Sequence, residues 1–566
     1  MATSRVPIAI RLIAMAAGIS LLFASGACSS SSDDAATSQN GGTTTSTTRT
    51  GAGSAAIFTP SDGITISQRT PLNKWAKLTP EITDRLVAQG MRKGAIEKVT
   101  SDSLDKQSRD VQDWVVDHMT ADDGSSDSSN GDADPSRTTL IVAPVVEADS
   151  STRQYGDYVT RPTDDSSSPT DSSKSDSSSS SDASSDGAND VSDEDDTERN
   201  AYDRLNSALK LARDAGMHVI LLANGVDGFS PDAFVSFSTP EQIGMIQATK
   251  LVAKLDLAKA SKDNPKAIEV LIPSSPASDE SGSDSASSSG SADGADETTE
   301  TDDAFAREAF AGMWKVLQPY FSQGKAYSPS GLLTKATEDS DWRNVTVSVS
   351  DKKDISDELD RRLPQTKTDG AKTRTRIDGI IAMNDYVASV VTDELDALGY
   401  TGSAADINPS ITISGIVGNI TGRKDLHRGS VPDPAKSPET DDSDSSDANG
   451  DSTDAQSSDE SASDWPIVTG FGGYVDTMPQ VVNGKQWMTG LENRKAIAAD
   501  IAEVTVRLNR KESAADLKYV TKQRVPGSSS KTKVNTIAEE PLSVSAYNLK
   551  TALIDPGYIT MADAGL

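Results

Sequence analysis

The stretch Thr138-Thr139-Leu140-Ile141-Val142-Ala143-Pro144-Val145-Val146 is a continuous run without a charged residue. A run without polar alternation is typical of a strand that is buried on both faces, as in a parallel sheet covered by helices. Residues 218–223 form a second such run, which follows an amphipathic helix predicted over 201–215. These segments predict an α/β fold built on parallel sheets.

Strand and helix patterns alternate along most of the chain. Strands are predicted at 63–67, 95–99, 138–146, 218–223, 233–237, 267–272, 345–349, 379–383, 411–417 and 466–470, and helices at 81–89, 103–119, 201–215, 241–255, 305–321, 355–363, 387–398 and 495–508. Because these units are too many for one compact open sheet, we expect two Rossmann-like lobes joined by a hinge. Ligands of such sheets bind beyond the carboxyl ends of the strands, so we expect a cleft between the lobes that closes on a ligand.

Acidic tracts interrupt this alternation. The chain has 566 residues, a formal net charge of −32 and 35% hydrophobic residues. Long Ser/Asp-rich insertions near 121–137, 150–198, 274–303 and 419–465 lack the apolar residues that a core requires, and we expect them to be disordered. Without them, roughly 400 residues of ordinary globular composition remain, enough for two lobes. The insertions after 146 and 273 follow predicted strands, so they either flank the cleft and disfavour anionic ligands or extend into solvent without effect.

The N-terminus has the features of a bacterial export signal. Arg5 and Arg11 accompany an apolar run over 12–24, and small residues lead to Cys28. The run is too short to span a bilayer well, which takes about 20 residues. The junction before Cys28 resembles the lipobox of bacterial lipoproteins, whose thiol is acylated and becomes the new N-terminus; the alternative is an incidental cysteine in an ordinary secretory signal. We therefore predict that residues 1–27 are removed and that 28–58 tether a lipid-anchored protein at the extracellular face of the cell membrane.

The residue inventory gives little support for catalysis. Cys28 is the only cysteine, and His118, His218 and His427 show neither metal-ligand spacing nor a Ser/His/Asp arrangement. We expect no enzyme, no metal site and no cofactor. The acidity argues against a nucleic-acid partner, because phosphate binding requires basic patches.

Six groups of short motifs follow one another along the chain. They are Lys74-Trp75; Val235-Ser236-Phe237 with Ile243-Gly244 and Gln247; Val316-Leu317-Gln318-Pro319-Tyr320 with Gly324-Lys325, Ser330-Gly331, Ala336-Thr337 and Trp342; Ile381-Ala382-Met383-Asn384-Asp385; Gly484-Lys485-Gln486-Trp487-Met488-Thr489; and Leu542-Ser543-Val544-Ser545 with Asn548 and residues 553–558. In this order they resemble bacterial extracellular sugar-binding proteins of ABC importers, of the xylose-binding and multiple-sugar-binding type.

This resemblance implies the type I periplasmic-binding-protein fold, with a chain that crosses between the lobes three times. On that pattern, residues 59–224 form the first lobe, 225–418 form mainly the second lobe, and 466–566 return through both. The function implied is capture of a carbohydrate between the lobes and its delivery to an ABC permease in the membrane, by a monomer.

The resemblance also implies the sugar site. Asn384 and Asp385 follow a buried strand and correspond to residues that hold sugar hydroxyls, although an asparagine there can instead cap the next helix. Lys74 is a candidate hydroxyl donor. Trp75 is a candidate stacking face, with core packing as the alternative.

The chain departs from the family pattern at three places. Asn224-Gly225 stands where the family has Asp-Arg, Ser238-Thr239 where it has Asp-Asn, and Phe471-Gly472 where it has Gln-Asp. Asn224 and Phe471 remain candidate ligand contacts, while Phe229 and Tyr474 either line the site or simply pack. Because polar sugar contacts are weakened, a second hypothesis is a surface sensory or interaction lipoprotein that retains the fold with a degenerate sugar site.

Overall fold

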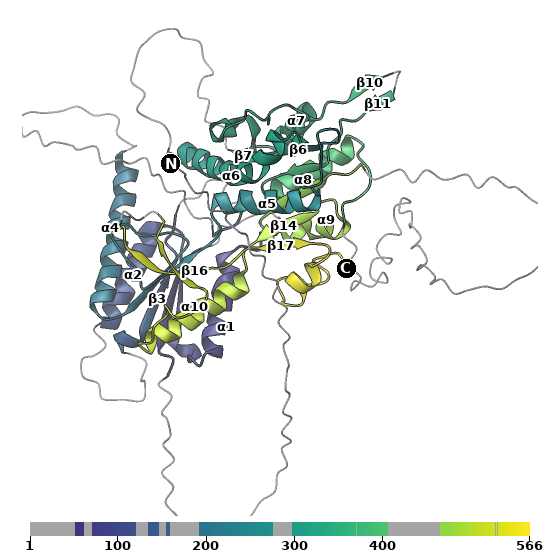
Figure 1. Ribbon diagram of the computed structural model, residues 1–566. Coiled ribbons are helices and arrows are strands. Elements are labelled where there is room, and N and C mark those ends of the chain that lie inside the picture. The colour runs from purple at the N-terminus through teal and green to yellow at the C-terminus, as the bar shows by residue number, and fades with distance from the viewer. Residues whose placement is uncertain are drawn as a thin grey trace, which may run out of the picture. The chain divides into compact units, whose positions relative to one another are not determined.

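Two largely parallel sheets organise the protein in the computed structural model (Figure 1). The structure describes residues 51–61, 71–119, 134–146, 154–158, 192–274, 297–368, 371–405, 464–526, 528 and 530–566. Cys28 and the strands predicted at 63–67 and 411–417 lie outside these residues. Within them, no helix combines the length and the apolar composition that crossing a membrane requires.

The first sheet has seven strands in the order β15-β16-β5-β4-β3-β1-β2, all parallel to their neighbours except β15. The strands are β1 (Ser54–Pro60), β2 (Ile96–Ser101), β3 (Thr138–Val142), β4 (His218–Leu222), β5 (Ala233–Ser236), β15 (Val520–Arg524) and β16 (Lys533–Ala538). Every residue of β3 is buried, as its apolar run predicted.

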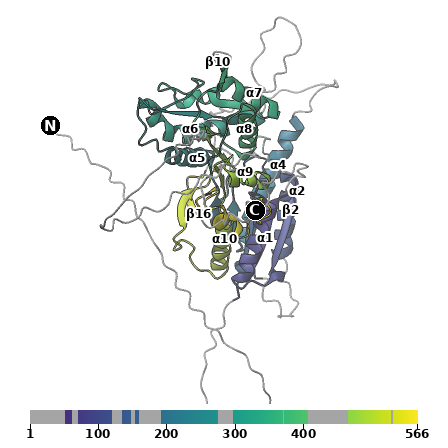
Figure 2. The same ribbon diagram turned by 90° about the vertical axis from the view of Figure 1, so that its right-hand side faces the viewer.

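Helices cover the first sheet in two pairs. They are α1 (Trp75–Ala88) with α10 (Arg494–Asn509), and α2 (Leu104–Met119) with α4 (Ser192–Asp214). Apolar residues of α1 and α10 share one core with the sheet, whereas those of α2 and α4 share another. Figure 2 shows α2 and α4 side by side.

The second sheet has six strands in the order β17-β14-β13-β12-β6-β8, with only β17 antiparallel to its neighbour. They are β6 (Lys266–Val270), β8 (Ala326–Tyr327), β12 (Gly379–Ile381), β13 (Ile467–Phe471), β14 (Met488–Leu491) and β17 (Leu542–Ser545). The helices of this half are α5 (Pro240–Lys254), α6 (Glu297–Ser322), α7 (Lys352–Arg362), α8 (Asp385–Ala397) and α9 (Met478–Asn483). Residues of α5 and α6 share one core with the sheet, and those of α7 and α8 share another.

Short elements complete the two halves. The pairs are β7 (Ile272–Ser274) with β9 (Thr346–Ser348), and β10 (Thr366–Thr368) with β11 (Ala371–Thr373). Short helical turns lie at Lys93–Ala95, Pro135–Arg137, Asp339–Val345, Val475–Thr477 and Lys550–Ile554.

The chain passes between the sheets three times: after β5, after β14 and after β16. In Figure 1 the yellow-green α10 and the yellow β16 therefore lie among the purple and blue elements of the first sheet. The crossings confirm the predicted two-lobed α/β architecture, the type I periplasmic-binding-protein fold.

Several predicted boundaries were wrong. The first strand is β1, which begins at Ser54 inside the stretch predicted to be a tether, because Ala55, Ala56 and Ile57 are buried in the sheet. The predicted first lobe ends at residue 224, but β5 also pairs with β4 in the first sheet, so the first crossing follows β5. Ordered residues also occur inside the tracts predicted to be disordered, at the starts of α4 and α6 and at 154–158.

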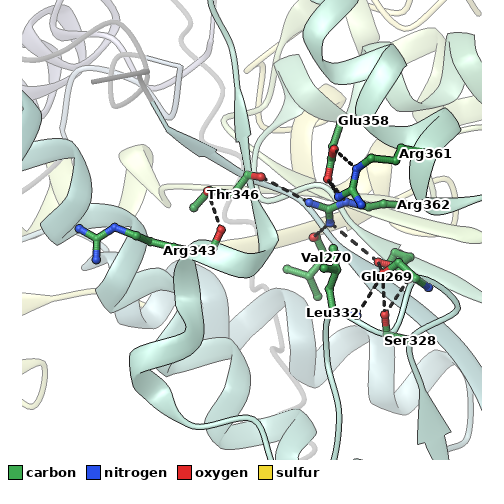
Figure 3. Close-up of polar contacts among 10 residues, drawn as sticks. Glu269, Val270, Ser328, Leu332, Arg343, Thr346, Glu358, Arg361 and Arg362 are labelled. Atoms are coloured by element: carbon green, nitrogen blue, oxygen red, sulfur yellow. Dashed lines mark hydrogen bonds and ion pairs between the residues drawn. The ribbon is translucent and has the colours of Figure 1, made fainter. Parts of the chain in front are cut away.

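The second half contains a buried polar cluster (Figure 3). Arg362 and Glu269 are both fully buried, with 3.8 Å between Arg362 Nη1 and Glu269 Oε2. Arg362 Nε lies 2.6 Å from Glu358 Oε1, and Glu269 accepts hydrogen bonds from Ser328 Oγ at 2.8 Å and from the Ser330 N–H at 2.9 Å. Burial raises the pKa of Glu269, although these partners oppose the shift. The cluster therefore joins β6, α7 and the loop after β8 by interactions that leave few polar atoms unsatisfied.

Candidate functional site

The same tight turn ends a strand in each half. Ala223 after β4 and Met383 after β12 have left-handed backbones, with φ of 63° and 55°. The N–H of the next residue, Asn224 or Asn384, donates to the carbonyl two residues back, at 2.7 Å and 2.6 Å respectively. Such a conformation in a non-glycine residue costs about 1–3 kcal/mol, and it is found most often at functional sites. Because a strand of each sheet ends in this strained turn, the carboxyl ends of both sheets are candidate places for functional residues.

Met383 is supported by a residue from another motif. Gln247 on α5 donates from Nε2 to the Met383 carbonyl at 2.6 Å, and its Oε1 accepts from Thr469 Oγ1 at 3.0 Å. Because all three residues are buried, these bonds fix the turn that precedes Asn384.

Asn384 is fully buried and has two roles. Its Oδ1 accepts from the Val387 N–H at 2.9 Å, which caps α8, so the predicted alternative of a helix cap is correct. Its Nδ2 donates to Gln154 Oε1 at 2.9 Å. The amide therefore also reaches a residue from the loop that follows β3.

Asp385 lies in the framework of the second half. Its Oδ1 accepts from Gln486 Nε2 at 2.6 Å, and its Oδ2 accepts from Thr489 Oγ1 at 2.7 Å and from the Tyr474 N–H at 3.0 Å. Burial raises the pKa of Asp385, and these hydrogen bonds oppose the rise. The Asn-Asp motif and the motif over 484–489 thus interlock, and Asp385 fixes the loop that carries Tyr474.

Lys74 and Trp75 lie at the start of α1. Lys74 Nζ is 2.9 Å from Asp157 Oδ1, and the Trp75 N–H donates to Asp157 Oδ2 at 3.2 Å. The Trp75 ring is buried, with its centroid 4.8 Å from that of Tyr158 and 5.9 Å from that of Phe237. Core packing is therefore its observed role, and one of its neighbours again comes from the loop after β3.

Phe471 and Asn224 differ in their surroundings. Phe471 is buried in the core of the second half, with its ring centroid 6.4 Å from that of Tyr155. Asn224 is buried at the end of β4, and the backbone of Gly225 lies against Pro526 so closely that a Cβ would come within 2.5 Å of its carbonyl oxygen.

The two other candidate aromatic residues, Phe229 and Tyr474, have different surroundings. Phe229 packs in a core of the first half, beneath the Arg213 guanidinium at 4.5 Å. Tyr474 donates from its hydroxyl to the Gln154 carbonyl at 2.9 Å.

Four of the predicted residues form hydrogen bonds with one short stretch that the sequence reasoning missed. This stretch is Gln154-Tyr155-Gly156-Asp157-Tyr158, which we call the 154–158 segment. Its polar partners, which we call the interlobe site, are Asn73, Lys74, Trp75, Asn384 and Tyr474. The sequence signal was a pair of tyrosines inside an otherwise Ser/Asp-rich tract.

Glu492 joins two of the crossing segments next to this site. Its N–H donates to Asn73 Oδ1 at 3.1 Å, and its Oε1 accepts from the Ser238 N–H at 2.9 Å. The carboxylate is buried, which raises its pKa. The positions of Asn73 and of the crossing after β5 are therefore coupled through one residue, by its backbone N–H and its carboxylate.

The chemistry of the interlobe site is that of recognition. It combines amide, ammonium and hydroxyl donors with buried aromatic rings, the combination found in small-molecule sites. Among the residues described, no group of three or more histidine, cysteine or acidic side chains is placed to hold a metal ion.

Comparisons with known proteins give structural likenesses alone. No protein-family model and no curated protein matches the sequence. A Clostridium phytofermentans ABC-transporter solute-binding protein with bound β-D-glucose is 16% identical, with 90% of this chain and 99% of that chain covered and a TM-score of 0.43. A carbohydrate-transporter solute-binding protein from Chloroflexus aurantiacus in complex with D-glucose is 15% identical, with 90% and 97% covered and a TM-score of 0.43. A periplasmic ribose ABC transporter protein from Conexibacter woesei is 10% identical, with 88% and 95% covered and a TM-score of 0.40.

Proposed function

We propose that this chain is an exported solute-binding protein that captures a carbohydrate between its two α/β halves without altering it. The observation that carries the proposal is the convergence of donors and aromatic rings from both halves on the 154–158 segment. A sugar needs donors and acceptors for its hydroxyls and apolar faces for its C–H surface. The location, beyond the carboxyl ends of parallel strands, is where open α/β sheets bind ligands.

The proposed roles follow from the contacts. Lys74 and Asn384 donate to sugar hydroxyls, as they now donate to Asp157 and Gln154. Trp75, whose ring now packs against Tyr158, supplies an apolar surface for the sugar C–H groups when a sugar takes the place of Tyr158. Asp385 orients the loop at Tyr474 and acts through it, since its hydrogen bonds are internal.

Thermal unfolding in the presence of sugars tests the proposal. D-xylose, D-glucose and larger oligosaccharides are added in turn, and a bound ligand at 100 times its dissociation constant is expected to add about 2.7 kcal/mol to the unfolding free energy. Lys74→Gln is expected to weaken that shift, while Lys77→Gln, which is exposed on the same helix, leaves it unchanged. The proposal would be contradicted if no sugar raised the unfolding free energy, either of the wild type or of a variant in which the 154–158 segment no longer binds at the interlobe site.

The proposed location is the outer face of the cell membrane, through acylation of Cys28. We expect wild-type protein in the membrane fraction and Cys28→Ser protein released in soluble form. Equal partitioning of the two would exclude the lipid anchor.

The proposed partner is an ABC permease, to which a monomer delivers the sugar. Cells that lack this chain are expected to lose uptake of the labelled sugar that the protein binds, and to regain it on complementation with the wild type but not with Lys74→Gln. Uptake that is independent of the chain would favour a sensory role.

A second candidate function is a surface sensory or interaction lipoprotein with a degenerate sugar site. Two observations favour it: the 154–158 segment lies among the residues proposed to hold the sugar, and apolar Phe471 replaces a polar contact of the family pattern. This candidate predicts no sugar response even after the segment has been displaced.

A further inference from the structure

The 154–158 segment is held by the cores of both halves. The Tyr155 ring belongs to the core of the second half, with its centroid 4.6 Å from that of Phe305. The Tyr158 ring belongs to a core of the first half, stacked on Phe237 at 4.7 Å. The two tyrosines are only 1% and 2% exposed. A surface loop does not normally place two aromatic rings, three residues apart, in two different cores.

Residues of the first half form hydrogen bonds with the backbone of the segment and an ion pair with the Asp157 carboxylate. Asn73 donates from Nδ2 to the Tyr155 carbonyl at 3.3 Å, and the Asp157 N–H donates to the Asn73 carbonyl at 2.8 Å. Asp157 pairs with Lys74 and accepts from the Trp75 N–H, as described above. The Tyr158 hydroxyl donates to the Lys74 carbonyl. Main-chain hydrogen bonds combined with pockets for side chains are one of the ways in which proteins recognise peptides.

Residues of the second half form hydrogen bonds with Gln154, at the other end of the segment. Asn384 Nδ2 donates to Gln154 Oε1, and the Tyr474 hydroxyl donates to the Gln154 carbonyl, both at 2.9 Å. Because each half contributes donors and a ring, the segment lies in the place that the proposed function gives to a solute.

Gly156 shows that the fit is specific. Its φ is +112°, and a Cβ there would come within 2.4 Å of Asn73 Cβ and 2.8 Å of the Asn73 carbonyl oxygen. Only glycine satisfies both the backbone conformation and the contact. The turn between the two tyrosines is therefore shaped to Asn73.

From these contacts we infer that the interlobe site is a peptide-binding site, and that the 154–158 segment is its internal, reversibly bound ligand, in competition with any solute. The inference rests on the proposed function only for the nature of that solute. A tethered ligand is present at a high effective concentration, so it lowers the apparent affinity for an external solute by the fraction of molecules in which it is bound. Solute capture and release of the segment are then one linked equilibrium.

Displacement of the segment by a steric change tests this inference in the full chain. Gly156→Ala cannot seat against Asn73, whereas Gly90→Ala is a matched control, because Gly90 also has positive φ, +95°, and has no atom within 4 Å of the added Cβ. Hydrogen exchange of the Asp157 amide is expected to be at least about tenfold faster in Gly156→Ala than in Gly90→Ala or the wild type. Unchanged exchange would overturn the inference.

Binding of the segment in trans provides a readout without a sugar. The probe is the acetylated and amidated pentapeptide Gln-Tyr-Gly-Asp-Tyr, and its counterpart with alanine in place of glycine is the control. We expect Gly156→Ala protein to bind the probe at least about tenfold more tightly than wild-type protein does, because the internal copy no longer competes. Equal binding of probe and control peptide, or of both proteins, would overturn the inference.

A second variant covers the case in which Gly156→Ala does not fold. Asp157→Asn removes the charge that pairs with Lys74 and leaves the backbone free to fold as before. As for Gly156→Ala, we expect faster exchange of the residue 157 amide and tighter binding of the peptide than in the wild type. No change in either quantity would contradict the inference. Peptide binding without any sugar response would refute the proposed function and support the inference, while a sugar response without peptide binding would do the reverse.

Discussion

The Asn384 amide joins a helix terminus to the 154–158 segment. Its oxygen accepts the Val387 N–H and its nitrogen donates to Gln154 Oε1, each at 2.9 Å, while the residue is fully buried. The same side chain therefore stabilises α8 and holds the internal peptide. Substitutions that keep one of these bonds and remove the other can separate the two contributions.

Asn384→Ser and Asn384→Ala form such a pair. Serine retains a cap acceptor but has no amide donor for Gln154, whereas alanine loses both. We expect Asn384→Ala to be about 1 kcal/mol less stable than Asn384→Ser in urea unfolding, the usual value of an N-cap. Both variants are expected to show the same faster exchange of the Asp157 amide. Identical stabilities would mean that the cap contributes nothing.

Arg362→Ala is expected to destabilise the protein strongly. It leaves the fully buried Glu269 without its cationic partner, whereas the half-buried Glu358 keeps Arg361, and breaking a buried pair typically costs about 3–5 kcal/mol. The matched control is Arg361→Ala, because Arg361 also pairs with Glu358 but its side chain is 58% exposed. That change is expected to cost about 0–1 kcal/mol in the same urea titration. Similar losses for the two variants would contradict the role of the buried cluster.

The raised pKa of the Asp500 carboxyl group should make the free energy of unfolding depend on pH. Burial, together with the Glu539 carboxylate, raises its pKa from 3.8 to about 7. A pKa raised on folding favours the protonated folded state, so this contribution is present below the unfolded-state pKa and is lost as the pH rises to about 7.

Asp500→Asn removes this titration. We expect its melting temperature to exceed that of the wild type at about pH 8 and the difference to shrink at about pH 4, where the wild-type carboxyl is protonated. Asp84→Asn, an exposed change on α1, serves as the control and is expected to follow the wild type at both pH values. A difference that does not depend on pH would contradict the assignment.

Gly470→Ala tests the framework around Asp385. A Cβ at Gly470 would lie 2.4 Å from Asp385 Oδ1 and 2.8 Å from Gln486 Nε2, so these buried atoms must move. Overpacking of this kind costs about 1–3 kcal/mol. Gly94→Ala adds the same group where no atom lies within 4 Å and is expected to be nearly neutral. If Gly470→Ala left the free energy of unfolding unchanged, the hydrogen bonds of Asp385 would be able to rearrange at little cost, contrary to this prediction.

The fold could be predicted because its signals are local and strong. Runs such as that of β3 lack polar alternation, as is typical of strands buried on both faces, and the family resemblance implied the three crossings. The start of β1 was missed because small residues at Ala55 and Ala56 resemble the end of a tether until they are paired with β2 and β3. The predicted end of the first lobe at residue 224 fell before β5, because no local signal distinguishes a strand that pairs in one sheet from a strand that pairs in another.

The candidate site was predicted in part. Lys74, Trp75 and Asn384 were singled out as candidate sugar contacts, a role that stays a prediction, and the structure brings all three to the 154–158 segment. The segment itself was lost among Ser/Asp-rich sequence, because composition averages over a window and a five-residue turn gains its order from long-range contacts. The packing roles of Phe471 and Phe229 likewise depend on partners far away in sequence.

The repeated crossing of the chain means that neither half is made from one continuous length of polypeptide. A single break between residues 405 and 464 would put β12 and β13 on different molecules, and likewise β5 and β16, yet each of these pairs would still be joined by its ladder of backbone hydrogen bonds. A nicked chain should therefore persist as a tight two-piece complex and come apart only on denaturation. Integrity of the covalent backbone and integrity of the molecule are separate properties in this architecture.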